Sequence, residues 1–291
     1  MESTPKNHNK YGYKPDLAVR ITRVVSNAII SLFGLNSNNR LSVELQQQLN
    51  PTITIPIPEN KQLIFTTGHG RLLWRANTLF TEEEMIIDWF NSFEKKDIFY
   101  DIGANVGIYS SYVGKLKECK VYSFEPEINN IQTMYSNFYQ NKLLDNCIVV
   151  PLAADNETKL KPFHIREFTK GGALNSIGRE SFYESQIGNP FVSQTFCMKT
   201  DDIIDLYKLP IPTKVKVDVD SNELKVIEGM IHTLNHIKEL YIELDKSIDE
   251  HKSVFKILEE NGFIVKKEEK VNLKHTSTIS NFLFENNKGI S

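Results

Sequence analysis

Short apolar runs alternate with stretches of helical pattern from about residue 97 onward. Five runs have the length and composition of buried strands, at residues 98–102, 120–124, 147–153, 214–219 and 239–244. Helices are predicted after four of them, from about 106 and at 127–141, 223–234 and 251–260. This alternation indicates an α/β fold with a Rossmann-like, doubly wound, mostly parallel sheet. Residues 263–268 and 277–284 predict a terminal antiparallel pair.

Two regions depart from this alternation. Residues 156–212 carry several glycines and a Gly-Asn-Pro sequence, which predicts loops and edge strands. Such an excursion beside the carboxyl edge of a sheet is a common place for substrate recognition. Residues 1–80 are predicted to form an N-terminal extension, and residues 81–291 the main domain.

Apolar residues of the extension recur at helical spacing on one face: Leu17, Ile21, Val24, Val25, Ala28, Ile29, Leu32 and Phe33. They predict an amphipathic helix that packs on the core or on a second subunit, through which the chain could form a homo-oligomer. Binding to a membrane surface is less favoured, because the polar face offers only Arg20 and Arg23. A hairpin is predicted farther along the extension, with Gln62–Thr67 and Arg71–Trp74 as its two strands. Thr81 is expected to cap an acidic first helical turn.

Composition narrows the class of protein. The net charge of -3 and pI near 6.2 give no reason to expect nucleic-acid binding. Three widely spaced cysteines predict reduced thiols in a cytoplasmic protein. No stretch is long and apolar enough to span a bilayer, and the histidines and cysteines show no metal-site spacing. We therefore expect no metal.

The segment Phe99–Gly107 is the first that carries chemistry. A buried strand enters a turn at Gly103, where the backbone can approach a ligand closely, and a helix follows. The sequence lacks both the full dinucleotide fingerprint and a phosphate-binding loop. Asp101 could accept hydrogen bonds from a ligand amine, although a purely structural turn would use the same residues.

Acidic residues end three later strands. Glu125 follows the second strand about 20 residues after Gly103, a spacing typical of a carboxylate that binds ribose hydroxyls. Asp155 could bind an adenine amine or simply form a turn. Strand alternation places Lys216, Asp218 and Asp220 on one face at the ligand-binding edge. We favour helix capping for Asp220 with Glu223, and function for Asp218 and Lys216.

Together these segments resemble the FkbM family of class I methyltransferases. The similarity covers roughly residues 81–267 and rests on an ordered set of motifs: Thr81–Glu84 leading to Trp89, Asp101–Gly107, Phe124–Pro126, Gly171–Leu174, Thr200–Asp202, Lys216–Asp218, Glu223 and Tyr241–Glu243. The resemblance implies a seven-stranded sheet with a reversed last strand and S-adenosylmethionine as cofactor. It also implies methyl transfer, usually to oxygen, with hydroxyls of sugars and polyketide-type metabolites among the acceptors.

The resemblance also implies roles for individual residues. The positions that match the family's cofactor site are Glu83, Asp101, Ile102, Gly103, Ala104, Asn105, Glu125, Pro126 and Asp155. Of these, Asp101, Gly103 and Asn105 would surround the methionine part, Glu125 the ribose and Asp155 the adenine.

We therefore expect an O-methyltransferase acting on a carbohydrate or related small polar molecule. Asp218 would orient or deprotonate the acceptor hydroxyl, and Lys216 would support its charge. The family usually shows Glu-Gly-Ala where this chain has Asp220-Ser221-Asn222. That departure motivates an alternative, a catalytically silent cofactor-binding partner protein. A nucleotide-sugar dehydrogenase or epimerase is disfavoured, because the third glycine and a Tyr-x-x-x-Lys pair are missing.

Overall fold

The computed structural model describes residues 21, 24–25, 51–81, 83–178, 191–220, 222–271 and 278–288. The amphipathic helix expected between Leu17 and Phe33 lies outside this part of the chain, apart from Ile21, Val24 and Val25, which are helical and exposed. A homo-oligomer through that helix therefore stays a prediction. None of the described helices is long and apolar enough to cross a membrane.

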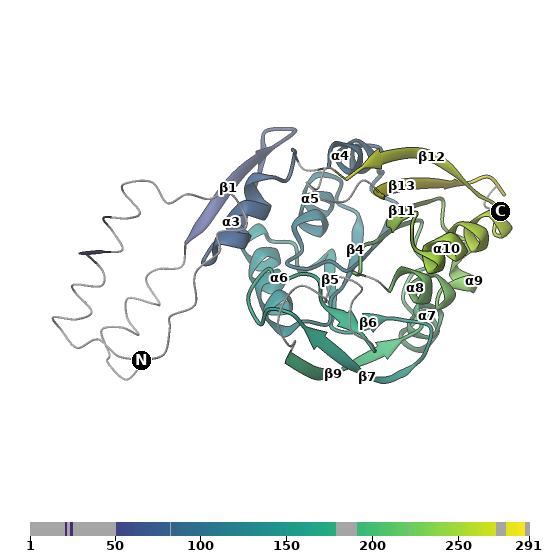
Figure 1. Ribbon diagram of the computed structural model, residues 1–291. Coiled ribbons are helices and arrows are strands. Elements are labelled where there is room, and N and C mark those ends of the chain that lie inside the picture. The colour runs from purple at the N-terminus through teal and green to yellow at the C-terminus, as the bar shows by residue number, and fades with distance from the viewer. Residues whose placement is uncertain are drawn as a thin grey trace.

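A seven-stranded sheet forms the centre of the molecule (Figure 1). Its order is β12 (Phe263–Lys270), β13 (Ile279–Asn286), β11 (Glu239–Asp245), β10 (Lys214–Val217), β3 (Ile98–Ile102), β4 (Lys120–Phe124) and β5 (Cys147–Val150). Strands β11, β10, β3, β4 and β5 pair in parallel, whereas β13 runs antiparallel to both β11 and β12. The predicted sheet, its terminal antiparallel pair and its reversed last strand are confirmed.

Helices cover both faces of this sheet, as alternation along the buried strands requires. Phe99 of β3 enters one hydrophobic core and Tyr100 the other. The first core is completed by α3 (Gly70–Asn77), α4 (Glu84–Asn91), α5 (Ile108–Leu116) and α6 (Ile128–Asn141). The second is completed by α7 (Thr200–Tyr207), α8 (Glu223–Glu228), α9 (Ile231–Leu234) and α10 (Asp249–Glu260). Figure 1 shows these two groups on opposite sides of the strands.

The insertion after β5 forms a second, four-stranded sheet, in agreement with the edge strands expected there. Its order is β6 (Ala153–Ala154), β9 (Phe191–Met198), β7 (Lys159–Ile165) and β8 (Ser176–Ile177). The prediction of one continuous strand over 147–153 was wrong, since β5 ends at Val150 and Ala153 pairs with Cys197 of β9. Helix α7 was not predicted.

Two expectations for the N-terminal half are corrected by the structure. The hairpin pairs β2 (Lys61–Thr66) with β1 (Thr52–Ile57), not with Arg71–Trp74. Residues 71–74 are helical, because the His69 side chain caps α3 by accepting a hydrogen bond from the Arg71 N–H. The next helix, α4, has Glu83 rather than Thr81 at its N-cap. The hairpin and α3 pack into the first core, and the domain boundary at residue 80 remains a prediction.

Candidate active site

The direction of winding reverses between β3 and β10, which neighbour each other in the sheet although about a hundred residues separate them. At their carboxyl ends the Asp218 N–H donates to the Ile102 carbonyl at 3.0 Å. Gly103 follows with a φ of 81°, and a Cβ there would overlap the Asp218 carbonyl oxygen. In doubly wound sheets, ligands bind at such a switch point. The two candidate residues Gly103 and Asp218 thus meet where a site is expected.

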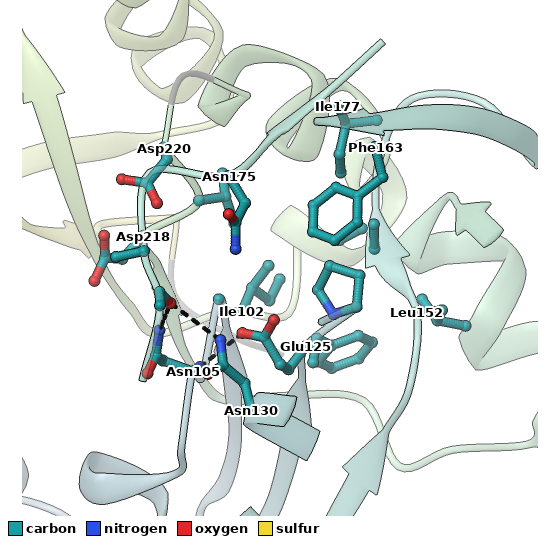
Figure 2. A pocket seen from close by; sticks show the side chains of 18 of the residues that line it. Ile102, Asn105, Glu125, Asn130, Leu152, Phe163, Asn175, Ile177, Asp218 and Asp220 are labelled. Carbon is teal, nitrogen blue, oxygen red and sulfur yellow. Dashed lines mark hydrogen bonds between the residues drawn. The ribbon is translucent and has the colours of Figure 1, made fainter. Parts of the chain in front are cut away.

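A cavity of about 720 Å³, counted with its mouth, opens at this point. Its two ends differ in chemistry, and Glu125 lies between them, as Figure 2 shows. One end is apolar, lined by Leu152, Phe163 and Ile177; the other is polar, lined by Asn175, Asp218 and Asp220. Phe163 and Ile177 come from the inserted sheet, where recognition was expected but no residue was singled out.

Glu125 is held rigidly by backbone donors at the floor of this cavity. Its Oε2 accepts from the Asn105 N–H at 2.9 Å and its Oε1 from the Glu127 N–H at 2.8 Å. The side chain is only 6% exposed, and this burial raises its pKa to about 8 despite those hydrogen bonds. Each oxygen keeps a lone pair that could accept a ligand hydroxyl.

A second, smaller cavity adjoins the first and shares Arg75, Gly103, Asn105 and Asp218 with it. Its other lining residues include Leu79, Ala104, Tyr109 and Lys216. Of the predicted cofactor residues, Ile102, Gly103, Asn105, Glu125 and Pro126 therefore line the first cavity and Ala104 the second. Of the two predicted catalytic residues, Asp218 lies at the junction formed by the four shared residues, and Lys216 lines the second cavity.

Lys216 lies between the Asp218 carboxylate, which lines both cavities, and the buried Asp101 carboxylate, which lines neither. Its buried Nζ donates to Asp218 Oδ2 at 2.9 Å and lies 3.7 Å from Asp101 Oδ1. Burial alone would lower the pKa of Lys216, but the charges of Asp218 and Asp101 outweigh it and raise that pKa. Lys216 is therefore a fixed ammonium that orients Asp218, rather than a proton donor.

Asp101 does not line either cavity. Its side chain is 1% exposed and accepts a 2.6 Å hydrogen bond from Ser110 Oγ. Burial raises its pKa, and the Lys216 charge counteracts that shift. Its Oδ1 is buried without a hydrogen bond, 3.7 Å from Lys216 Nζ, and binding of a ligand amine by Asp101 stays a prediction.

Asp155 also lies outside both cavities. Its side chain is fully buried, and its Oδ1 forms an ion pair with Lys161 Nζ at 2.6 Å. This ion pair links the residue after β6 to β7 within the inserted sheet. The neighbouring Ala153 and Ala154, not Asp155, line the apolar end of the first cavity. Among the described residues, Glu83 does not line a cavity either; its Oε2 lies 3.4 Å from the Tyr241 hydroxyl.

The expected capping of α8 by Asp220 and Glu223 was wrong. Asn222 occupies the N-cap, while Asp220 Oδ2 accepts from the Leu174 N–H at 2.6 Å. Glu223 is buried against His251, 3.0 Å from its Nε2. Asp220 has a φ of 51°, so strand alternation ends before it and it does not continue the face of Lys216.

The turn Gly171–Leu174 forms one wall of the cavity and is anchored by two amides. Asn105 Nδ2 donates to the Gly172 carbonyl at 2.7 Å, and Asn130 Nδ2 donates to the same oxygen at 3.1 Å. Asn130 Oδ1 also accepts from the Gly171 N–H at 2.9 Å. Sequence reasoning missed Asn130, because a polar residue inside a predicted helix carries no signal by itself.

Carboxylates surround the junction of the two cavities. Glu243 of β11 has a pKa well above its ordinary value, because it is buried and faces the charges of Asp218 and Glu83. Burial and the charge of Asp218 raise the pKa of Asp220 to about 7. When ionised, Asp218 and Asp220 of the lining attract a cationic ligand, whereas Glu243 lies behind them and lines neither cavity.

Comparison with known proteins agrees with these features. Residues 101–265, more than half of the chain, match the family model described as the methyltransferase FkbM domain. The hexuronic acid methyltransferase AglP of Haloferax volcanii is 26% identical over 204 residues, which cover 67% of this chain and 75% of that protein. A tRNA (guanine(37)-N(1))-methyltransferase of Dictyostelium discoideum is 29% identical over 127 residues, which cover 44% of this chain but only 24% of that protein.

Among solved structures, a methyltransferase FkbM from Methylobacillus flagellatus KT aligns with 71% of this chain at 16% identity and a TM-score of 0.47. The alignment spans 47% of that protein, so this chain corresponds to about half of it. The fibrillarin pre-rRNA processing protein of Methanococcus jannaschii aligns with 80% of this chain at 15% identity and a TM-score of 0.45.

Proposed function

The chain belongs to the FkbM methyltransferase family and is an S-adenosylmethionine-dependent methyltransferase, and we propose that it methylates a hydroxyl of a carbohydrate or related small polar molecule. The observation that carries this proposal is the Asp218 carboxylate at the junction of the two cavities, beside Gly103 and held by Lys216. The sugar acceptor is supported by the similarity to a hexuronic acid methyltransferase.

The lining of the first cavity fits the adenosine part of the cofactor. Adenine would lie at the apolar end between Leu152 and Phe163, and the ribose hydroxyls would donate to Glu125. The Asp218 carboxylate at the junction would face the positively charged sulfonium and ammonium groups. The structure thus offers a matching group for each part of the nucleoside and for its charge.

The residues at the junction would act on the acceptor rather than on the cofactor. When bound, S-adenosylmethionine supplies an electrophilic methyl group on a sulfonium. Asp218 would accept a hydrogen bond from the acceptor hydroxyl and then its proton, as the oxygen bonds to the methyl carbon and the carbon–sulfur bond breaks to leave S-adenosylhomocysteine. Lys216 keeps that carboxylate in place through its 2.9 Å hydrogen bond.

The direct test is formation of S-adenosylhomocysteine from S-adenosylmethionine with hexuronic acids, their glycosides and neutral sugars as acceptors. Methylated sugar detected by mass spectrometry would support the proposal, and positions of the new methyl group would be read from its fragments. Binding of S-adenosylhomocysteine without turnover on any acceptor would instead favour the catalytically silent partner protein. Binding of NAD in place of S-adenosylhomocysteine would contradict both.

We expect binding of the nucleoside to strengthen as pH rises through about 8, the pKa to which burial raises Glu125. Ribose hydroxyls bind the ionised carboxylate more strongly, so binding lowers that pKa and releases a proton. Below the pKa, affinity should rise by up to about tenfold per pH unit, and it should level off above. Titration calorimetry with 5′-methylthioadenosine measures this, because that ligand does not titrate near pH 8.

Glu125→Gln should bind this ligand about 1–3 kcal/mol more weakly and with little dependence on pH. Glu118→Gln is the matched control, since Glu118 is an exposed carboxylate paired with Lys95 at the surface. A pH dependence that persists in Glu125→Gln would show that another group causes it.

A further inference from the structure

Arg75, at the junction of the two cavities, is a cation without an ion-pair partner among the described residues; its guanidinium carbon lies 6.0 Å from the centroid of the Trp74 ring. It lies on α3 and lines both the first and the second cavity. Its Nε is buried and has no hydrogen bond, and no described residue forms an ion pair with its guanidinium. By contrast, Arg71, one turn earlier on the same helix, forms an ion pair with Glu167 and lines neither cavity.

An unpaired, partly buried guanidinium is costly unless a ligand satisfies it. The carboxylates of the lining form no hydrogen bond with it: Asp218 pairs with Lys216, and Asp220 accepts from the Leu174 N–H and interacts with the Arg75 charge only at longer range. A guanidinium binds a planar carboxylate through two parallel hydrogen bonds, a geometry that a lysine cannot supply. Arg75 therefore has the chemistry of an anion-binding residue in an otherwise acidic site.

We propose that Arg75 binds a ligand carboxylate at this junction, and that this is the carboxylate of the methionine part of the cofactor. The inference rests on the proposed placement of adenosine, with its ribose at Glu125. A ligand that extends from there into the second cavity passes Gly103, Asn105 and Asp218, which line both cavities together with Arg75. The methionine part then meets acidic groups for its ammonium and Arg75 for its carboxylate. A carboxylate on the acceptor, such as that of a hexuronic acid, is the other possible source.

Two ligands that share adenosine but differ in the carboxylate test the proposal. S-adenosylhomocysteine carries the aminocarboxylate, whereas 5′-methylthioadenosine lacks it. Arg75→Gln should weaken the binding of S-adenosylhomocysteine about tenfold or more and leave the affinity for 5′-methylthioadenosine nearly unchanged. Arg75→Lys keeps the charge and should lose less affinity for S-adenosylhomocysteine than Arg75→Gln does. It replaces Arg75→Gln in the test if that variant does not fold. Arg71→Gln removes one charge from the same helix and should leave the ratio of the two affinities at its wild-type value.

The acceptor is tested separately, with the cofactor saturating. If Arg75→Gln leaves the ratio of the two affinities unchanged but raises KM for hexuronic acids and not for neutral sugars, Arg75 binds the carboxylate of the acceptor, which supports a carboxylate site but overturns its assignment to the cofactor. If neither quantity changes, the proposal is wrong while the methyltransferase function stands. If the wild-type protein binds neither nucleoside, the placement of adenosine fails first, and the inference fails with it.

Discussion

Asp218→Asn is expected to lower kcat by about 10²–10⁴-fold, the usual contribution of a general base. The variant keeps the size of the side chain and an oxygen that can accept from Lys216, but it cannot take up the proton of the acceptor. Asp218 lies after β10 and is partly exposed, so the fold should tolerate the change. Steady-state kinetics with the best acceptor of the sugar panel measure the effect.

Binding of S-adenosylhomocysteine separates this chemical effect from loss of the cofactor site. Its dissociation constant should change by less than about threefold, which is under 1 kcal/mol. Asp249→Asn is the matched control, because that carboxylate is 90% exposed and pairs with Lys252 on α10. A kcat close to that of wild type would show that Asp218 is not the base and that the acceptor oxygen needs none.

The sheet was predictable from sequence because its signal is local and repeated. Parallel strands buried on both faces appear as short apolar runs between turn residues, although β10 alternates lysine with valine. The number of strands and the reversed last strand came from the family resemblance, and the strand pairing confirms both. Glu125 was predictable for a similar reason, since strand ends and their spacing place it at one edge of the sheet.

The missed features depend on contacts between distant segments. Arg75 was hidden because Gly68-His69-Gly70 resembles a hairpin turn, whereas the His69 side chain starts a helix there. Asp101 and Asp155 have the residue type of ligand-binding groups, yet inside the protein Ser110 binds one oxygen of Asp101 and Lys161 pairs with Asp155. Sequence spacing can place a carboxylate at an edge, but it cannot tell whether a side chain elsewhere in the chain already satisfies it.

Asp220 illustrates the same limit at the point where this chain departs from its family. Its φ of 51° lies in the left-handed region, which a non-glycine residue adopts at some cost. The carboxylate offsets part of that cost by accepting from the Leu174 N–H, and so it ties the end of β10 to the turn Gly171–Leu174. The family-unlike sequence thus keeps the wall of the cavity in place, which supports an intact site rather than a silent one.

Gly103→Ala should abolish measurable cofactor binding and destabilise the protein by about 2–5 kcal/mol. Two effects add. The backbone has a φ of 81°, which is unfavourable for alanine, and the new Cβ would overlap the Asp218 carbonyl oxygen. Strands β3 and β10 would have to separate at the point where both cavities meet. Denaturant unfolding and titration with S-adenosylhomocysteine measure the two quantities.

Gly70→Ala is the matched control for this prediction. A Cβ at Gly70 meets no atom within 4 Å, and the residue lies in the first turn of α3, so alanine should leave stability unchanged or raise it by about 0.5–1 kcal/mol. Both variants add one methyl group to a glycine, and only one adds it at the switch point. If Gly103→Ala had the same free energy of unfolding and the same cofactor affinity as Gly70→Ala, β3 and β10 could not be packed as closely as described. The site would then have to lie elsewhere on the sheet edge.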